Sequence, residues 1–292
     1  MTVQRIDDIP CQKLVCCQKR PLEMYYFIDP LHPVCLDQDP IMKKLQLEYG
    51  HYIRLTYVLF GKFSPVPTIP TQTNAKNDPV TIEKPPGNIM NQATAPVIEY
   101  LPDIPFLAIK AAELQGRKAG IRYLKKLQEY YFYKNEDVTK LDTLLACAHE
   151  AELDVSLFKQ DLDSKTPLKA LVSDLQIMRE MGIEEIPAVV IFNTYDDEEG
   201  LKLVGVNPYE IYVDILTEML KKVPVRRELP SLLSYIQHKQ FVTTKEITII
   251  YNWHRVKAEL ELKKLVLRQE IQKIQTKYGT AWRYTGDPYS QQ

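Results

Sequence analysis

The stretch Pro21-Leu-Glu-Met-Tyr-Tyr-Phe-Ile-Asp-Pro-Leu-His-Pro-Val-Cys35 sets the architecture of this chain. Its first half is an apolar run, rich in aromatic residues, that favours a buried β-strand from Leu22 to Ile28. Asp29-Pro30 ends the run, and a helical pattern extends from about Leu36 to Tyr49. The stretch therefore predicts a strand, a sharp turn and a helix that begins with x-Pro-x-Cys.

A second strand is predicted directly after this helix. Gly50 is a typical helix end, and apolar residues alternate from Tyr52 to Phe60. Two strands around one helix form a βαβ unit, in which the strands are parallel and the crossover is right-handed.

The middle of the chain changes character twice. Seven prolines lie between residues 62 and 96, so we expect an irregular surface loop there. Helical patterns follow, separated at Gly116, Asn135 and Leu153-Asp154. We predict helices near residues 104–115, 118–133, 137–151, 154–160 and 166–181, which form an insertion between two halves of a sheet.

The sheet resumes at Gly182-Ile-Glu-Glu-Ile-Pro-Ala-Val-Val-Ile-Phe192. In thioredoxin-type redox folds a proline in this position is typically cis and lies opposite the x-x-Cys turn, so we predict a cis bond at Ile186-Pro187. A trans proline at the first residue of a strand is the alternative. A last strand over residues 201–206 and a helix over residues 209–221 complete this half.

The C-terminal part begins after a linker at Pro224. Helical patterns cover residues 231–239 and 244–251, and we predict one long helix from about Asn252 to Tyr278. Its apolar stripe should be buried, and docking against the same chain is expected. The stripe consists of Trp253, Val256, Leu260, Leu267, Ile271 and Ile274.

The charge of the chain bears on which partners it could bind. The net charge is −1, so the total charge does not imply binding to nucleic acid or to an anionic membrane. Of 37 Lys/Arg and 38 Asp/Glu residues, 12 and 6 lie at or after Arg226, which leaves 25 and 32 before it. The tail is therefore basic and the body acidic, which would suit an acidic partner or a solvated surface.

The chain shows no membrane-spanning run and no secretory signal. Its five cysteines form no regular disulfide framework. Both observations predict a cytoplasmic protein with reduced thiols.

Three cysteines gather near the N-terminus as Cys11-x4-Cys16-Cys17. Thiolates suit zinc, so a zinc site is one interpretation. The spacing differs from that of a standard zinc finger, and the segment holds no histidine. A tail with redox-sensitive thiols is the other interpretation, and no further cofactor is expected.

These patterns predict an α/β sheet with a large helical insertion and a C-terminal helical extension, and the arrangement resembles a thioredoxin-like (DsbA-like) fold. We expect five divisions. A Cys-bearing tail covers residues 1–20, and the first half of the thioredoxin-like domain covers 21–61. A Pro-rich loop with the helical insertion covers 62–185, the second half of the domain covers 186–223, and a basic helical extension covers 224–292.

The turn at residues 29–35 and the turn at residues 181–187, on either side of a helical insertion, resemble the DsbA-like branch of the thioredoxin superfamily. More narrowly, Pro21-Leu-Glu-Met-Tyr-Tyr-Phe-Ile-Asp-Pro-Leu and Ile41-Met-Lys-Lys-Leu-Gln-Leu-Glu-Tyr-Gly resemble the SpxH/YjbH family of adaptors. The resemblance implies a cytoplasmic, non-enzymatic protein that binds the transcriptional regulator Spx and presents it to the ClpXP protease. It also implies zinc at the N-terminal cysteines.

The resemblance also implies a Cys-Pro-x-Cys turn at positions 32–35. Here that turn reads His32, Pro33, Val34 and Cys35, so the first thiol of the pair is replaced and we interpret the site as a degenerate redox turn. His32 could act as an acid or base, yet no second catalytic group lies at a readable spacing. The alternative function is a thiol-disulfide oxidoreductase of the DsbA or glutathione-transferase type, which would need a monothiol route through Cys35.

Overall fold

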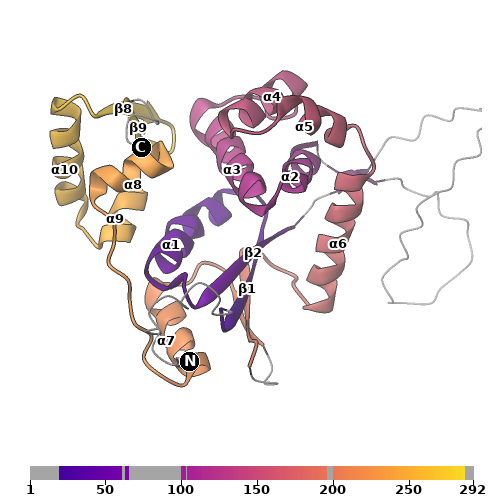
Figure 1. Cartoon of the computed structure of the whole chain (residues 1–292), viewed down its shortest axis with the longest axis horizontal. Coiled ribbons are helices and arrows are strands. Elements are labelled where there is room, and N and C mark those ends of the chain that lie inside the picture. Colours follow the sequence, from indigo (N-terminus) through magenta and orange to yellow (C-terminus); the bar gives the residue numbers. More distant parts are fainter. Residues whose placement is uncertain (1–19, 61–62, 66–99, 103, 196–199, 287–292) are drawn as a thin grey trace, which may run out of the picture.

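The computed structural model describes residues 20–60, 63–65, 100–102, 104–195 and 200–286. A four-stranded sheet lies at the centre of the molecule, with the strand order β2-β1-β5-β6. Helices α1 and α7 lie on one side of the view in Figure 1, and α6 lies on the other. Within these residues, no helix is both long and apolar enough to cross a bilayer.

The predicted βαβ unit is confirmed. Strand β1 (Leu22–Ile28) pairs in parallel with β2 (Ile53–Leu59), and α1 (Pro33–Tyr49) connects them. Alternate residues of β1 point to opposite faces of the sheet. Met24 and Tyr26 enter the main core, whereas Phe27 enters a smaller cluster on the other face.

The helical insertion follows β2 and agrees closely with the predicted segments. Short strands β3 (Phe63–Pro65) and β4 (Tyr100–Pro102) pair with each other before the first helix. Most of the predicted Pro-rich loop lies outside the described residues. The helical elements are α2 (Ile104–Leu114), α3 (Arg117–Gln128), the π-helical turn η3 (Glu129–Lys134), α4 (Leu141–Glu150), α5 (Val155–Leu162) and α6 (Thr166–Glu180).

The second half of the sheet returns beside β1. Strand β5 (Ala188–Asn193) runs antiparallel to β1, and β6 (Leu201–Val204) runs antiparallel to β5. Helix α7 (Tyr209–Leu220) then packs against α1. Tyr212 of α7 is fully buried in the main core, which fixes α7 on this face of the sheet.

The expected long helix at residues 252–278 is wrong. Helix α10 ends at Leu267, and Gln269 adopts a left-handed backbone conformation with φ of 62°. The chain then forms a hairpin from β8 (Ile271–Thr276) and β9 (Gly279–Tyr284), so the C-terminal extension is a mixed module and not purely helical. Isoleucines at positions 271 and 274 fit a helical stripe by spacing, but β-branched residues also favour a strand.

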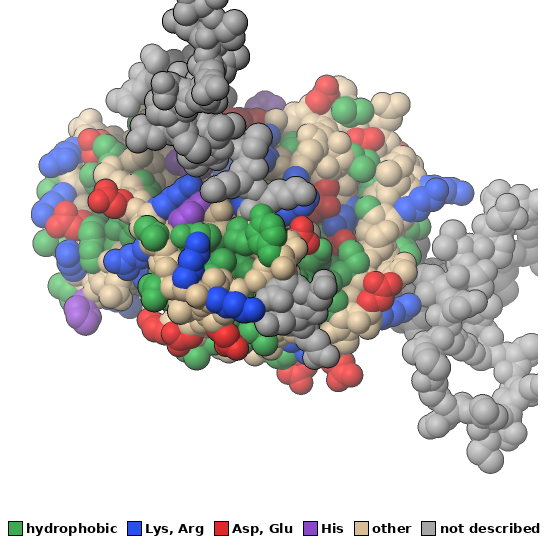
Figure 2. Space-filling model, turned by 60° about the horizontal axis from the view of Figure 1, so that its bottom comes forward, with side chains coloured by type: hydrophobic (Ala, Val, Ile, Leu, Met, Phe, Trp, Pro, Cys, Tyr) green, Lys and Arg blue, Asp and Glu red, His purple; other side chains and the backbone are tan. Residues whose placement is uncertain are grey.

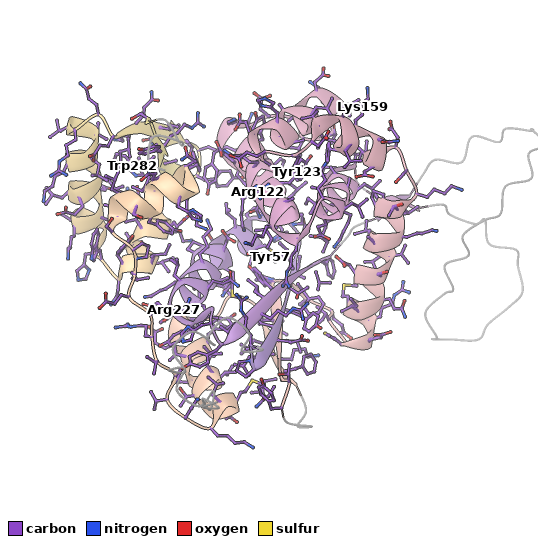
Figure 3. The ribbon with its side chains drawn as sticks, in the orientation of Figure 1. Tyr57, Arg122, Tyr123, Lys159, Arg227 and Trp282 are labelled. Carbon is purple, nitrogen blue, oxygen red and sulfur yellow. The ribbon has the colours of Figure 1, made fainter. Side chains whose placement is uncertain are left out.

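This C-terminal module has its own core around Trp282 (Figure 3). The indole N–H of Trp282 donates to Thr244 Oγ1 at 2.9 Å. Its sheet has the order β7-β9-β8. Only Ala258, Leu262 and Leu265 of α10 are buried, so Val256, Leu260 and Leu267 of the predicted stripe are exposed. The remaining elements are α8 (Leu232–Lys239), β7 (Phe241–Thr243), α9 (Thr244–Tyr251) and α10 (Arg255–Leu267).

Buried charges fasten this module to α1. Lys43 Nζ lies 3.1 Å from the Asp39 carboxylate and 2.9 Å from the Glu246 carboxylate of α9. Lys125 of α3 is the second cation paired with Asp39, and the Tyr235 hydroxyl donates to Glu246 at 2.5 Å. Burial opposes the ionisation of Asp39, but Lys125 and Lys43 outweigh it and hold the pKa of this carboxyl below its usual value.

Candidate functional site

The candidate site is the turn between β1 and α1. The Asp29 carboxylate accepts the N–H of Leu31 at 2.9 Å, and the His32 N–H donates to the Asp29 carbonyl at 3.1 Å. Asp29 thus folds the chain back immediately after β1. Pro33 is the first helical residue, where its missing N–H costs no helical hydrogen bond.

His32 is the N-cap of α1. Its Nδ1 accepts the N–H of Val34 at 3.3 Å, a contact that requires an unprotonated Nδ1. The side chain therefore has a structural role in starting the helix. Its ring is half-buried at the surface, in the position that would hold an attacking thiol in a dithiol site.

Cys35 lies behind this turn and is only 2% exposed. Its N–H donates to the His32 carbonyl at 3.1 Å, and its carbonyl accepts the Tyr26 hydroxyl at 3.3 Å. Burial raises the pKa of the Cys35 thiol to about 11. A helix N-terminus usually favours a thiolate, but here burial dominates and the sulfur stays protonated at neutral pH.

The second turn lies beside the first. The Ile186-Pro187 peptide bond is cis, as predicted. Ala188, the next residue, pairs with Phe27 near the end of β1, so the two turns share one end of the sheet. The Pro187 carbonyl accepts the Gly205 N–H at 2.7 Å, which brings the end of β6 to the same place.

Exposed valines surround the two turns. Val34 is 38% exposed on the first turn, and Val204 and Val206 are 45% and 47% exposed beside Pro187. Gln38 Oε1 accepts the Asn207 N–H at 3.0 Å, which holds the segment after β6 against α1. We name Val34, Val204 and Val206 the valine rim. The sequence analysis missed Val204 and Val206. Val204 ends β6, and Gly205, with φ of 79°, turns the chain between the two valines, so no simple strand periodicity indicated that both are exposed.

The surface next to the rim is also apolar and basic. Figure 2 brings forward the face that carries α7, and hydrophobic side chains gather there with Lys and Arg side chains beside them. Ile211, near the start of α7, is exposed. Val223 and Val225 of the linker are also exposed, but they lie toward the other end of the sheet, where the Val225 N–H donates to the Tyr52 hydroxyl at 3.2 Å. Scattered apolar side chains are ordinary on a protein surface, but apolar side chains gathered beside the two turns suit contact with another protein.

The predicted metal ligands Cys11, Cys16 and Cys17 lie outside the described residues, so zinc binding by them stays a prediction. Within the described part of the chain, no group of three or more His, Cys, Asp or Glu residues could hold a metal ion. The other described cysteine, Cys147, is buried, and burial raises its pKa to about 12. It belongs to the core, as its apolar neighbours in the sequence indicate.

Comparisons with known proteins agree with this geometry. A sequence profile of the thioredoxin family matches residues 25–214. The ClpXP adapter protein SpxH of Halalkalibacterium halodurans is 41% identical over 275 residues, covering 91% of this chain and 90% of the relative. The SpxH of Bacillus subtilis is 35% identical over 277 residues, again covering 91% and 90%.

A solved structure described as a protein disulfide isomerase, from Nitrosomonas europaea, has a similar fold. Its TM-score is 0.51 at 16% identity, and the match covers 68% of this chain and 98% of that one. At this identity the likeness concerns the fold alone.

Proposed function

Because the chain belongs to the thioredoxin family and, within it, to the family of the ClpXP adapter protein SpxH, we propose that it is an adaptor that binds an Spx-type regulator and promotes its degradation by ClpXP. The regulator is the direct partner, and the protease is engaged through the complex. Its place of action is the cytoplasm, where cysteines remain reduced.

The observation that carries this proposal is a turn of redox type that lacks its first thiol and buries its second. His32 replaces the attacking residue and caps α1, while Cys35 is buried and protonated. The exposed side chains at this end of the sheet include those of the valine rim, which can contact a partner protein but contain no nucleophile. Exposed apolar side chains beside the cis-proline turn suit contact with a partner protein.

Digestion of the purified regulator by ClpXP tests the adaptor function. Adding this chain should increase the digestion rate, and the double variant Val204→Asp/Val206→Asp should lose most of that increase. Val256→Asp is the matched control, because Val256 is 81% exposed on α10, away from the rim. An unchanged rate with the unmodified chain would refute the adaptor function, and an equal loss in the control would refute the role of the rim.

The alternative, an oxidoreductase, makes a different prediction. Reduction of insulin by a monothiol route would require the Cys35 thiolate, which burial disfavours. We expect no insulin reduction above that of Cys35→Ser. Activity that disappears in Cys35→Ser would favour the enzyme over the adaptor.

A further inference from the structure

A basic depression lies at the end of the main sheet that is opposite the two turns. On one face of the sheet, Ile177 and Met178 of α6 pack into a cluster that includes Phe27 and Val58, near the turns. Towards the start of β1 and β2 the same face is open. Two adjoining hollows of about 460 and 770 Å³ lie there.

Three arginines define this depression, and we name it the arginine groove after Arg20, Arg54 and Arg117. Arg54 and Arg117 line both hollows, and Arg20 lines the larger one. They come from three places in the chain: the residue before Pro21, strand β2 and the first turn of α3. No local sequence pattern brings them together, so the sequence analysis did not find the groove.

Each guanidinium is anchored by one described contact. Arg20 donates to the Ile53 carbonyl at 3.3 Å, Arg54 to Glu23 at 3.4 Å, and Arg117 to Thr56 Oγ1 at 2.9 Å. A guanidinium carries five N–H donors in a planar fork. The anchors therefore orient the three groups and leave donors for a ligand.

The charges of the groove are unbalanced. Of the two acidic side chains in its wall, Glu23 already binds Arg54, and Glu113 is paired with Lys110 at 2.8 Å. Burial lowers the pKa of Arg117, and the nearby charges of Arg54 and Arg20 lower it further. An added anion would relieve this repulsion.

The other lining residues favour a polypeptide ligand. Tyr25 and Tyr195 flank the arginines, and tyrosine and arginine, like tryptophan, are enriched among the residues that dominate binding between proteins. A long polyanion such as nucleic acid would meet Glu23 and Glu113, and the part of the chain before Arg226 has an excess of acidic residues. A short carboxylate-rich segment in the groove meets the same two glutamates, but it extends over less of the acidic surface and can pair bidentately with arginine.

We propose that the arginine groove is a docking site for a short acidic segment of a partner protein. The site lies at the opposite end of the sheet from the valine rim, so it is a second contact surface. Electrostatic docking of this kind accelerates association and weakens as salt rises.

Fluorescence anisotropy on the full chain tests the proposal directly. The probe is a fluorescein-labelled ten-residue peptide of alternating Glu and Ser, and its comparison is the same peptide with Gln in place of Glu. The Glu peptide should bind at least about tenfold more tightly than the Gln peptide, because only carboxylates pair with the guanidinium groups.

Arg54→Gln/Arg117→Gln should reduce the affinity for the Glu peptide by at least about tenfold. Arg255→Gln/Arg268→Gln is the matched control, because it removes two exposed arginines of which one, like Arg54, binds a glutamate. The control should retain its affinity within about twofold. Equal binding of both peptides, or an equal loss in the control, would overturn the proposal.

Discussion

Replacing Asp39 by Asn should loosen the attachment of the C-terminal module to the rest of the protein. In the native chain the Asp39 carboxylate lies between Lys125 and Lys43, and Lys43 continues to Glu246 of the module. Asparagine keeps the size of the side chain but removes its charge. Lys43 then keeps only the carboxylate of Glu246, and Lys125 loses the one carboxylate with which it is paired.

The expected cost follows from burial. Only 7% of the Asp39 side chain is exposed, and removing one partner of a buried ion pair typically costs about 3–5 kcal/mol. Asp37→Asn is the control, because Asp37 lies on the same helix and binds Lys245 of the module at 2.5 Å with both side chains more than half exposed. An exposed pair of this kind contributes about 0–1 kcal/mol.

Urea unfolding followed by tryptophan fluorescence measures the difference. Both tryptophans, Trp253 and Trp282, belong to the module, so the signal reports its release. With a denaturant slope of about 3 kcal/mol per M, Asp39→Asn should lower the midpoint by about 1–1.7 M and Asp37→Asn by at most about 0.3 M. Equal midpoints for the two variants would refute the view that the buried charges hold the module in place.

The Asp39 carboxylate also predicts a pH dependence of stability. Because its pKa is lower in the folded protein than in the unfolded chain, its stabilisation is complete above about pH 4 and is lost as the pH falls below that value. Acid should therefore destabilise the unmodified chain more steeply than Asp39→Asn. In a variant with Cys11, Cys16 and Cys17 changed to Ser, a thiol reagent at pH 7.5 should react with no thiol in the folded protein. After unfolding it should react with both Cys35 and Cys147. Rapid reaction of either thiol in the folded protein would contradict their burial. His32→Cys should add one reactive thiol at the start of α1 and cost about 1 kcal/mol through the lost cap, and an inert thiol there would mean that this position faces inward. Elemental analysis should find about one zinc per chain, lost in the triple Ser variant, if the N-terminal cysteines bind the metal.

Much of the fold was predictable because its signals are local. The Asp154 cap accepts the Leu157 N–H at 2.9 Å, as its place before an apolar run predicts, and α6 begins with proline in its first turn. The turn at His32 and the cis bond at Pro187 were likewise readable from short motifs.

The features that sequence reasoning missed depend on long-range contacts or on unusual backbone. Gln269 ends the predicted long helix in a left-handed conformation for which glycine or asparagine would be the expected signal. The arginine groove gathers side chains from distant segments. The charged pair Asp39 and Lys43 is enclosed by partners that are distant in the sequence, Lys125 of α3 and Glu246 of the module.

The coverage of α1 on both sides has a consequence for how the protein can be shortened. A chain cut near Pro224 would keep every strand of the main sheet. It would nevertheless expose Leu47, which packs against the core of the module, and leave Lys43 without Glu246. We therefore expect the smallest stable fragment to extend through β9, well beyond the last residue of the redox-type fold. A fragment that ends where the redox-type fold ends should aggregate.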